Sequence, residues 1–265
     1  MKNRLIVLGI LLSISIPVFA DEESAELAKK LANPVASLIS IPIEFNTDAD
    51  IGPSENGEVK SIKFTPVLPF EVNDDWNLIT RTIFSYVDQD LPDAGIDETG
   101  ISDIVLSLYF SPKKPTKSGW IWGAGPILLL NSATEDVLGA GRWGVGPGAV
   151  VLKQTGPWTI GGLTSYLADI GGDSDRDDVE QLFFQPFVSY NLPNGSTSLT
   201  LQSEIARDLE NYDTNAFALF TVNQMFKIGS QIMQGRVGVK HWYESADFGA
   251  DSTELSLRLT FLFPK

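Results

Sequence analysis

The amino-acid sequence predicts an all-β protein, a transmembrane up-and-down antiparallel β-barrel of about 12 strands with a short N-terminal periplasmic segment. Three observations support this prediction. Apolar residues alternate with other residues over consecutive segments, the connections between these segments are alternately short and long, and aromatic residues gather at the segment ends.

Residues 1–20 have the features of a secretory signal peptide. Lys2 and Arg4 precede an apolar run that is broken by Pro17 and ends in Val18-Phe19-Ala20. Small residues of this kind mark the cleavage site. A retained membrane helix would need about 20 consecutive apolar residues. We therefore expect export of the chain and removal of these residues.

The mature chain then divides into two parts. Residues 21–35 form a lead-in on the periplasmic side, where AELAKKLA before Pro34 favours a short helix. Residues 36–265 form the barrel. Together these segments imply a protein of the outer membrane of a Gram-negative cell, with outer-membrane lipid and the barrel-assembly machinery as its partners.

Twelve segments between residues 36 and 264 have the pattern of strands, and none has a convincing helical period. Their length of about ten residues suits a tilted strand that crosses a bilayer. The strands are expected to begin near Ala36, Val59, Trp76, Asp103, Gly119, Trp143, Trp158, Val179, Ser196, Asn215, Gln231 and Thr253.

The connections sort by length and by charge. The short ones are residues 73–75, 112–118, 153–157, 191–195 and 226–230, and the longer ones are 47–58, 88–101, 131–142, 170–179, 207–213 and 245–252. The longer set holds 20 acidic residues and three arginines, whereas the short set holds five lysines and two acidic residues. Tight periplasmic turns and long external loops produce this alternation in an outer-membrane barrel.

Aromatic residues lie at both ends of the predicted strands. Trp76, Trp120 and Trp158 open strands at the short-turn end, while Trp143 and Trp242 lie at the long-loop end. The two interfaces of a bilayer select amphipathic rings in this way. A soluble lectin-like sandwich, the structural alternative, would need its tryptophans in a core or a groove.

One motif points to a different class of protein. In LGAGRWGVGPGAV, Gly139, Gly141 and Gly144 have the G-x-G-x-x-G spacing of dinucleotide-binding loops. Such a loop must open a helix, but Gly146-Pro147-Gly148 would break a helix in its first turns. We therefore reject a nucleotide site. Instead, Gly144, Gly146 and Gly148 share one strand face, which we expect to line the interior and to make room for a bulky neighbour, a loop or a solute.

Several stretches carry a family pattern: LANPVASLISIPIEFN, FTPVLPFEVNDDWNLITRTI, SLYFSPKKP, LFFQPFVSY and LTFLFPK. They resemble the outer-membrane barrel family grouped under the MetA pathway of phenol degradation, many of whose members carry the mistaken label neuromedin U. The resemblance covers nearly all of the mature chain. It implies an outer-membrane location and a transporter role, with aromatic compounds as a substrate class. It carries over no binding residues.

Composition excludes some functions. The formal net charge is −15, and it becomes −17 when residues 1–20 are removed with their two basic residues. A nucleic-acid partner is not expected, because such a partner requires a basic face. The chain has no cysteine and one histidine, so we expect neither a disulfide framework nor a transition-metal site. No cofactor is expected.

The interior is the candidate functional site. Where alternation is clear, the apolar strand face meets lipid and the opposite face points inward. The inward face carries seven charged residues, Glu44, Lys63, Arg81, Glu204, Arg236, Lys240 and Arg258. Closure of the barrel places all of them except Glu204 on one side, as a net positive stripe. The facing of the fifth, sixth, seventh and tenth strands stays open.

Two interpretations of this stripe compete. It is either a paired network that fills a narrow barrel or an electropositive constriction that favours small anionic solutes such as carboxylates. The predicted function is accordingly a channel or transporter for small solutes, either aromatic or anionic, and not an enzyme. A non-conducting structural outer-membrane protein is the first alternative.

An interfacial lipid hydrolase is the second alternative. It would need a serine next to His241, but Ser245 lies roughly 13 Å away along a strand. In the acidic loops, Asp173, Asp175 and Asp177 begin a calcium motif that fails at its sixth and twelfth positions. A looser divalent-cation site in the external loops stays open.

Overall fold

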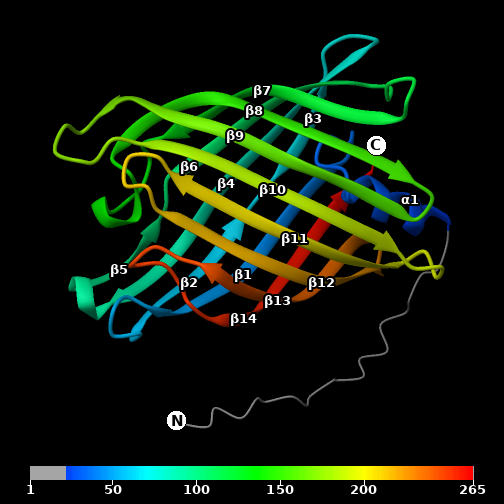
Figure 1. The fold of residues 1–265 in the computed structure, drawn as a ribbon. Helices are drawn as coiled ribbons and strands as arrows, with labels where there is room; N and C mark the ends of the chain where they lie inside the picture. The colour runs from blue at the N-terminus through cyan, green and yellow to red at the C-terminus, as the bar shows by residue number, and fades with distance from the viewer. Residues whose placement is uncertain (1–21, 265) are drawn as a thin grey trace, which may run out of the picture.

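The computed structural model describes residues 22–264 and contains a closed antiparallel β-barrel with one short helix at its N-terminal side (Figure 1). The all-β barrel predicted from the sequence is therefore confirmed. The signal peptide predicted for residues 1–20 lies outside the described residues. Within residues 22–264, no helix combines the length and the hydrophobicity that a bilayer-spanning helix needs.

The described part of the chain forms one α-helix, two short 3-10 helices and fourteen β-strands. In chain order they are α1 (Glu22–Leu31), β1 (Ile39–Ile51), β2 (Gly57–Phe64), β3 (Val67–Glu71), β4 (Trp76–Leu91), η1 (Pro92–Ala94), β5 (Ile96–Ile101), β6 (Ile104–Pro112), β7 (Trp120–Leu130), η2 (Asp136–Leu138), β8 (Arg142–Thr155), β9 (Trp158–Gly172), β10 (Glu180–Asn191), β11 (Thr197–Asp208), β12 (Thr214–Ile228), β13 (Gln231–Glu244) and β14 (Thr253–Phe263).

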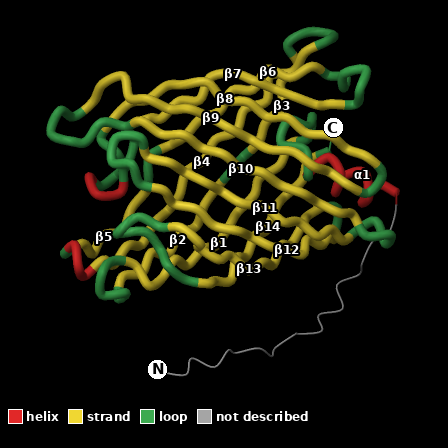
Figure 2. The backbone as a smooth tube through the Cα atoms, in the orientation of Figure 1, coloured by secondary structure: helices red, strands yellow, loops and turns green. Residues whose placement is uncertain are grey.

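Twelve strands make the wall of the barrel (Figure 2). Consecutive strands pair with one another, and β1 closes the ring by pairing with β14 from Ile39 opposite Phe263 to Phe45 opposite Leu257. Strands β2 and β3 count as one, because both pair with β1 on one side and with β4 on the other. Strand β5 pairs with β4 alone and stands outside the ring.

The interruption between β2 and β3 has a local cause. Pro66 has no N–H to donate to a neighbouring strand. The backbone on either side keeps its partners, because the Thr65 N–H donates to the Pro42 carbonyl and the Thr82 N–H donates to the Pro66 carbonyl, both at 3.1 Å. The strand therefore continues past the proline.

The strands extend further at the long-loop end than the sequence indicated. Residues 88–101, expected as a loop, instead form the end of β4, η1 and β5, which together make a hairpin. It turns at Gly95, whose φ of 67° favours glycine. Acidic residues alternate with others along this hairpin, and beyond a bilayer both faces of a strand can be solvated. This hairpin therefore lacks the alternating apolar residues by which the other strands were identified in the sequence.

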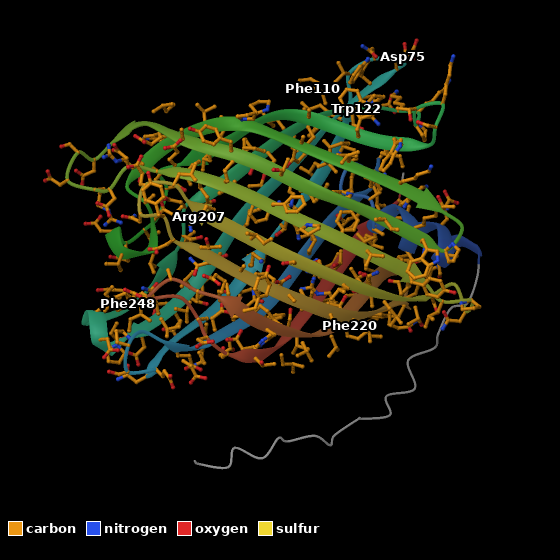
Figure 3. The ribbon with its side chains drawn as sticks, in the orientation of Figure 1. Asp75, Phe110, Trp122, Arg207, Phe220 and Phe248 are labelled. Carbon is orange, nitrogen blue, oxygen red and sulfur yellow. The ribbon has the colours of Figure 1, made fainter. Side chains whose placement is uncertain are left out.

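Apolar and aromatic side chains cover the outer surface of the barrel (Figure 3). Figure 3 shows Phe110 and Trp122 on this surface near the turn that holds Asp75, with Phe248 at the opposite end. Trp143 is exposed at the long-loop end, as an interfacial ring would be. Trp242 differs from the expectation, because its indole lies on the inner face and donates to the Asp48 carboxylate at 3.2 Å.

The N-terminal segment lies within the short-turn end of the barrel and crosses it. Leu27 and Ala28 of α1 pack in a buried cluster with inner-face residues of β12, β13 and β14. A few residues later, Val35 packs in a different cluster and lies against Gly123 of β7, on the far side of the ring. The apolar residues of this segment are buried inside the barrel. This N-terminal segment therefore forms a cap on the lumen at the short-turn end.

The glycine-rich face of β8 does line the interior, as its pattern predicted. A Cβ on Gly148 would lie 2.5 Å from Ile127, with Tyr109 next to it, and a Cβ on Gly144 would lie 3.2 Å from Leu129. These neighbours belong to a buried apolar cluster inside the barrel. The missing side chains therefore make room for bulky neighbours. The structure also fixes the facing of β7, β9 and β12, which the sequence left open.

The outward face of β13 allows a direct test of membrane insertion. Val237 is 53% exposed in the middle of that strand. We expect Val237→Arg to reduce folding into the membrane by about 2–4 kcal/mol, because the charge would lie against lipid near the midplane. Heat-modifiable gel mobility of membrane fractions measures the folded fraction.

Glu98→Arg is the control for this substitution, because Glu98 is an exposed residue on the β5 hairpin. It should leave the folded fraction unchanged. Equal losses in the two variants would show that the outward face of β13 does not meet lipid.

Candidate functional site in the barrel interior

A cavity of about 450 Å³ occupies the interior between the N-terminal cap and the middle of the barrel. One part of its wall comes from the cap, including Ala28, Leu31 and Asn33. The rest comes from inner-face side chains of the strands. Its volume is within the range of about 300–1,000 Å³ that holds small ligands in proteins. The inner faces of the strands determine what this cavity can bind.

A row of charged residues crosses the point where the barrel closes. Glu44 lies opposite Lys63 of β2 on one side and opposite Arg258 of β14 on the other. Arg258 in turn lies opposite Arg236 of β13. Four adjacent strands therefore contribute one residue each, in the order Lys63, Glu44, Arg258 and Arg236.

Glu44 binds all three of these cations. The Lys63 ammonium lies 3.2 Å from Glu44 Oε1, the Arg236 Nη2 lies 2.6 Å from Glu44 Oε2, and the Arg258 Nε donates to the same oxygen at 2.7 Å. Arg236 also donates to the Ser256 hydroxyl at 3.1 Å. Glu44 is only 5% exposed, so these pairs are shielded from solvent. The row keeps an excess of positive charge, because one carboxylate faces three cations.

A second ion cluster lies nearer the long-loop end. The Lys240 ammonium contacts the Asp48 carboxylate and lies 3.0 Å from Glu254 Oε2. It also lies 5.1 Å from the centre of the Trp242 ring, a distance typical of a cation–π contact. Lys240 is 5% exposed. This lysine is neutralised by its two carboxylates.

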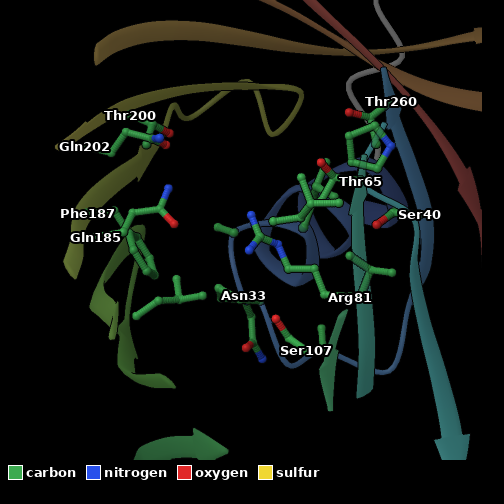
Figure 4. Close-up of a pocket in the computed structure, with 18 of the residues that line it drawn as sticks. Asn33, Ser40, Thr65, Arg81, Ser107, Gln185, Phe187, Thr200, Gln202 and Thr260 are labelled. Carbon is green, nitrogen blue, oxygen red and sulfur yellow. The ribbon is translucent and has the colours of Figure 1, made fainter. Parts of the chain in front are cut away.

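The remaining two charged residues, Arg81 and Glu204, both line the cavity. Glu204 Oε1 accepts hydrogen bonds from the side-chain amides of Gln185 at 2.9 Å and Gln202 at 3.1 Å. Arg81 forms no ion pair or hydrogen bond with any residue in the described range 22–264. Its guanidinium points into the cavity toward Gln185 (Figure 4).

The structure therefore divides the seven predicted residues into three groups. Glu44, Lys63, Arg236 and Arg258 form one network, Lys240 forms another, and Arg81 and Glu204 face the cavity outside both. Sequence reasoning missed Asp48 and Glu254. Every second residue of β1 points inward, and this spacing from Glu44 would have identified Asp48. The strand was expected to end before that residue. The Glu44 row and the Lys240 cluster are paired, as the first interpretation expected, while an electropositive constriction that favours anionic solutes stays a prediction.

The catalytic and metal hypotheses find no support in side-chain positions. The His241 Nδ1 lies 2.9 Å from the Thr253 hydroxyl on the outer face, whereas the Ser245 hydroxyl donates to the Ala250 carbonyl. The histidine and the serine considered for hydrolysis are thus committed to different partners. Throughout residues 22–264, no group of three His, Cys, Asp or Glu side chains is arranged to hold a metal ion.

The Glu44 network predicts a large effect of a small substitution. Glu44→Gln removes the only carboxylate of the row and leaves three neighbouring cations in a shielded position. We expect a loss of about 3–5 kcal/mol in unfolding free energy, as for other broken buried ion pairs. Chemical denaturation of the barrel in lipid vesicles measures this loss.

Glu71→Gln provides the matched control. Glu71 is an exposed residue whose carboxylate lies 3.4 Å from Lys113, and an exposed pair contributes less than about 1 kcal/mol. Similar losses for the two variants would show that the Glu44 row does not stabilise the barrel.

Comparisons with known proteins agree with this architecture. No family model matches the sequence, and no curated protein matches it. Among solved structures, an outer membrane channel from Pseudomonas putida F1 is similar, with a TM-score of 0.65 and 15% sequence identity over 88% of this chain and 98% of that one. The NanC porin is similar with a TM-score of 0.52 and 9% identity over 86% of this chain and 100% of that one. At these identities the likeness shows a shared barrel fold, and the family resemblance seen in the sequence stays a prediction.

Proposed function

We propose that the protein is an outer-membrane channel that admits small solutes, either anionic or aromatic, into a Gram-negative cell. The observation that carries this proposal is the cavity inside a closed barrel with an apolar outer surface. A barrel that served only as a membrane anchor would have no need for an interior space lined by polar and charged side chains. The similar solved structures are named as a channel and a porin, which supports the same function.

The path for a solute runs along the inner face that carries Arg81, Glu204 and the Glu44 row. The outer surface fits outer-membrane lipid, and the final strand ends on Phe263 with alternating apolar residues, which suits a client of the barrel-assembly machinery. Export through the N-terminal signal peptide belongs to the same proposal.

The N-terminal cap is the element that limits conduction in this proposal. Its contacts with the wall are mainly apolar, through Leu27, Ala28 and Val35. Polar contacts add to them, because the Gln154 amide donates to the Lys29 carbonyl at 2.8 Å and Lys227 pairs with Glu23 at 3.0 Å. Loosening these contacts should widen the path at the short-turn end.

Planar-bilayer recording tests the proposed function. We expect discrete channel openings from the wild-type protein and a higher conductance from Leu27→Asp. Leu27 is buried against the inner wall, so a charge there would displace α1 from the barrel.

Glu26→Gln is the control on the same helix. Glu26 is exposed and pairs with Lys30 of the same helix at 2.7 Å, so the conductance should match the wild type. If neither the wild type nor Leu27→Asp conducts, the protein is a non-conducting structural protein of the outer membrane and the proposal is wrong.

A further inference from the structure

One basic side chain inside the barrel differs from the others in its ion pairing. Lys63, Arg236 and Arg258 are held by Glu44, and Lys240 is held by Asp48 and Glu254. Arg81 has no such partner among the described residues. An unpaired guanidinium that faces a cavity is costly to bury unless an anion joins it. Its position in Figure 4, between two walls of the cavity, leaves its donors directed at open space.

The two walls around Arg81 differ in chemistry. On one side the cavity is lined by apolar and aromatic side chains, including Val105, Tyr109 and Ile127. On the other side, hydroxyl and amide groups such as Gln185 and Thr200 line it together with Phe187 (Figure 4). A ligand that satisfies both walls and Arg81 has one anionic end and a compact apolar body.

We propose that the cavity is a binding site for monocarboxylates with a compact apolar body, and that Arg81 binds the carboxylate. The planar guanidinium offers paired N–H donors that match the two carboxylate oxygens. The apolar body then packs on the side of Tyr109 and Ile127. This inference rests on the proposed channel function and names the class of solute that the channel selects.

A single negative charge fits the site better than two. Of the basic side chains that line the cavity, only Arg81 has no carboxylate partner among the described residues, so a second anionic group would have to compete with Glu44 for its cations. A cationic ligand is disfavoured, because five basic side chains line the cavity and only Glu204 among its lining residues is acidic. Glu204 is itself held by the amides of Gln185 and Gln202.

Calorimetric titration of the full-length barrel in lipid nanodiscs tests this site. The probes are benzoate, benzyl alcohol and benzylamine, which share a ring and differ in charge. We expect benzoate to bind at least tenfold more tightly than either of the others. Equal affinity for benzoate and benzyl alcohol, or tighter binding of benzylamine, would overturn the proposal without the need for any variant.

Variants then assign the role to Arg81. Arg81→Gln should lower the affinity for benzoate at least tenfold, and Arg81→Lys should restore part of it by returning the charge without the paired donors. Arg207→Gln is the matched control, because Arg207 lies at the long-loop end of β11 and donates to Thr214 at 2.8 Å. It should bind benzoate like the wild type. Unchanged benzoate affinity in a folded Arg81→Gln variant would contradict the assignment.

The two proposals fail in different ways. Binding of benzoate by a barrel that never conducts would refute the channel and leave the site intact. Conduction without any preference for benzoate over benzyl alcohol in the titration would refute the site and leave the channel intact.

Discussion

The pairing of β1 with β14 is the interaction on which the other features of the molecule depend. In a bilayer, an unpaired strand edge would expose backbone N–H and C=O groups to hydrocarbon, where each costs several kcal/mol. Closing the ring removes both edges and gives every strand an inside and an outside. The Glu44 row lies across this closure, since Glu44 of β1 binds Arg258 of β14 and Arg236 of β13. Ion pairing therefore adds to backbone pairing at the point where the two ends of the wall meet.

Closure also explains why the interior is divided. The half of the inner wall around Ile79, Tyr109 and Ile127 is packed with apolar side chains, and glycines in β7 and β8 accommodate them. The half formed by β13, β14, β1 and β2 holds the ion network. The N-terminal segment joins the two halves, with Leu27 on one side and Val35 on the other. The cavity is the space that remains between the apolar half, the ion network and the N-terminal segment. It therefore has both apolar and charged groups in its wall.

The strands of this barrel could be predicted because each alternates residue types and ends at turn-forming residues. Every predicted strand start lies within three residues of the observed one. The strand ends at the long-loop side were harder, because acidic residues such as Asp48 and Asp88 occur in strands that continue past the apolar band. In the sequence, the polar residues at these strand ends look like those of a loop.

Much of the interior could be predicted as well. Where apolar residues alternate clearly along a strand, every second residue lies on the same face, so the residues of the inward face can be identified. The partners could not be predicted. Glu44 and Arg258 are 214 positions apart in the chain, and their contact depends on the register at which β1 meets β14. No local pattern encodes that register. The same limit applies to α1, whose short apolar face is compatible with packing inside the barrel or elsewhere.

The acidic loops and the basic interior act on an anionic solute over different distances. Most of the 20 acidic residues of the long connections are exposed to solvent, where salt screens charges beyond about 8 Å at physiological ionic strength. The interior cations lie between low-dielectric walls, where screening is weak and the field is focused. A carboxylate therefore meets repulsion only close to the loops, and attraction once it is inside. Rising ionic strength weakens the first effect more than the second. In the channel proposed above, the loops would therefore control how fast an anion arrives, and Arg81 would control whether it stays.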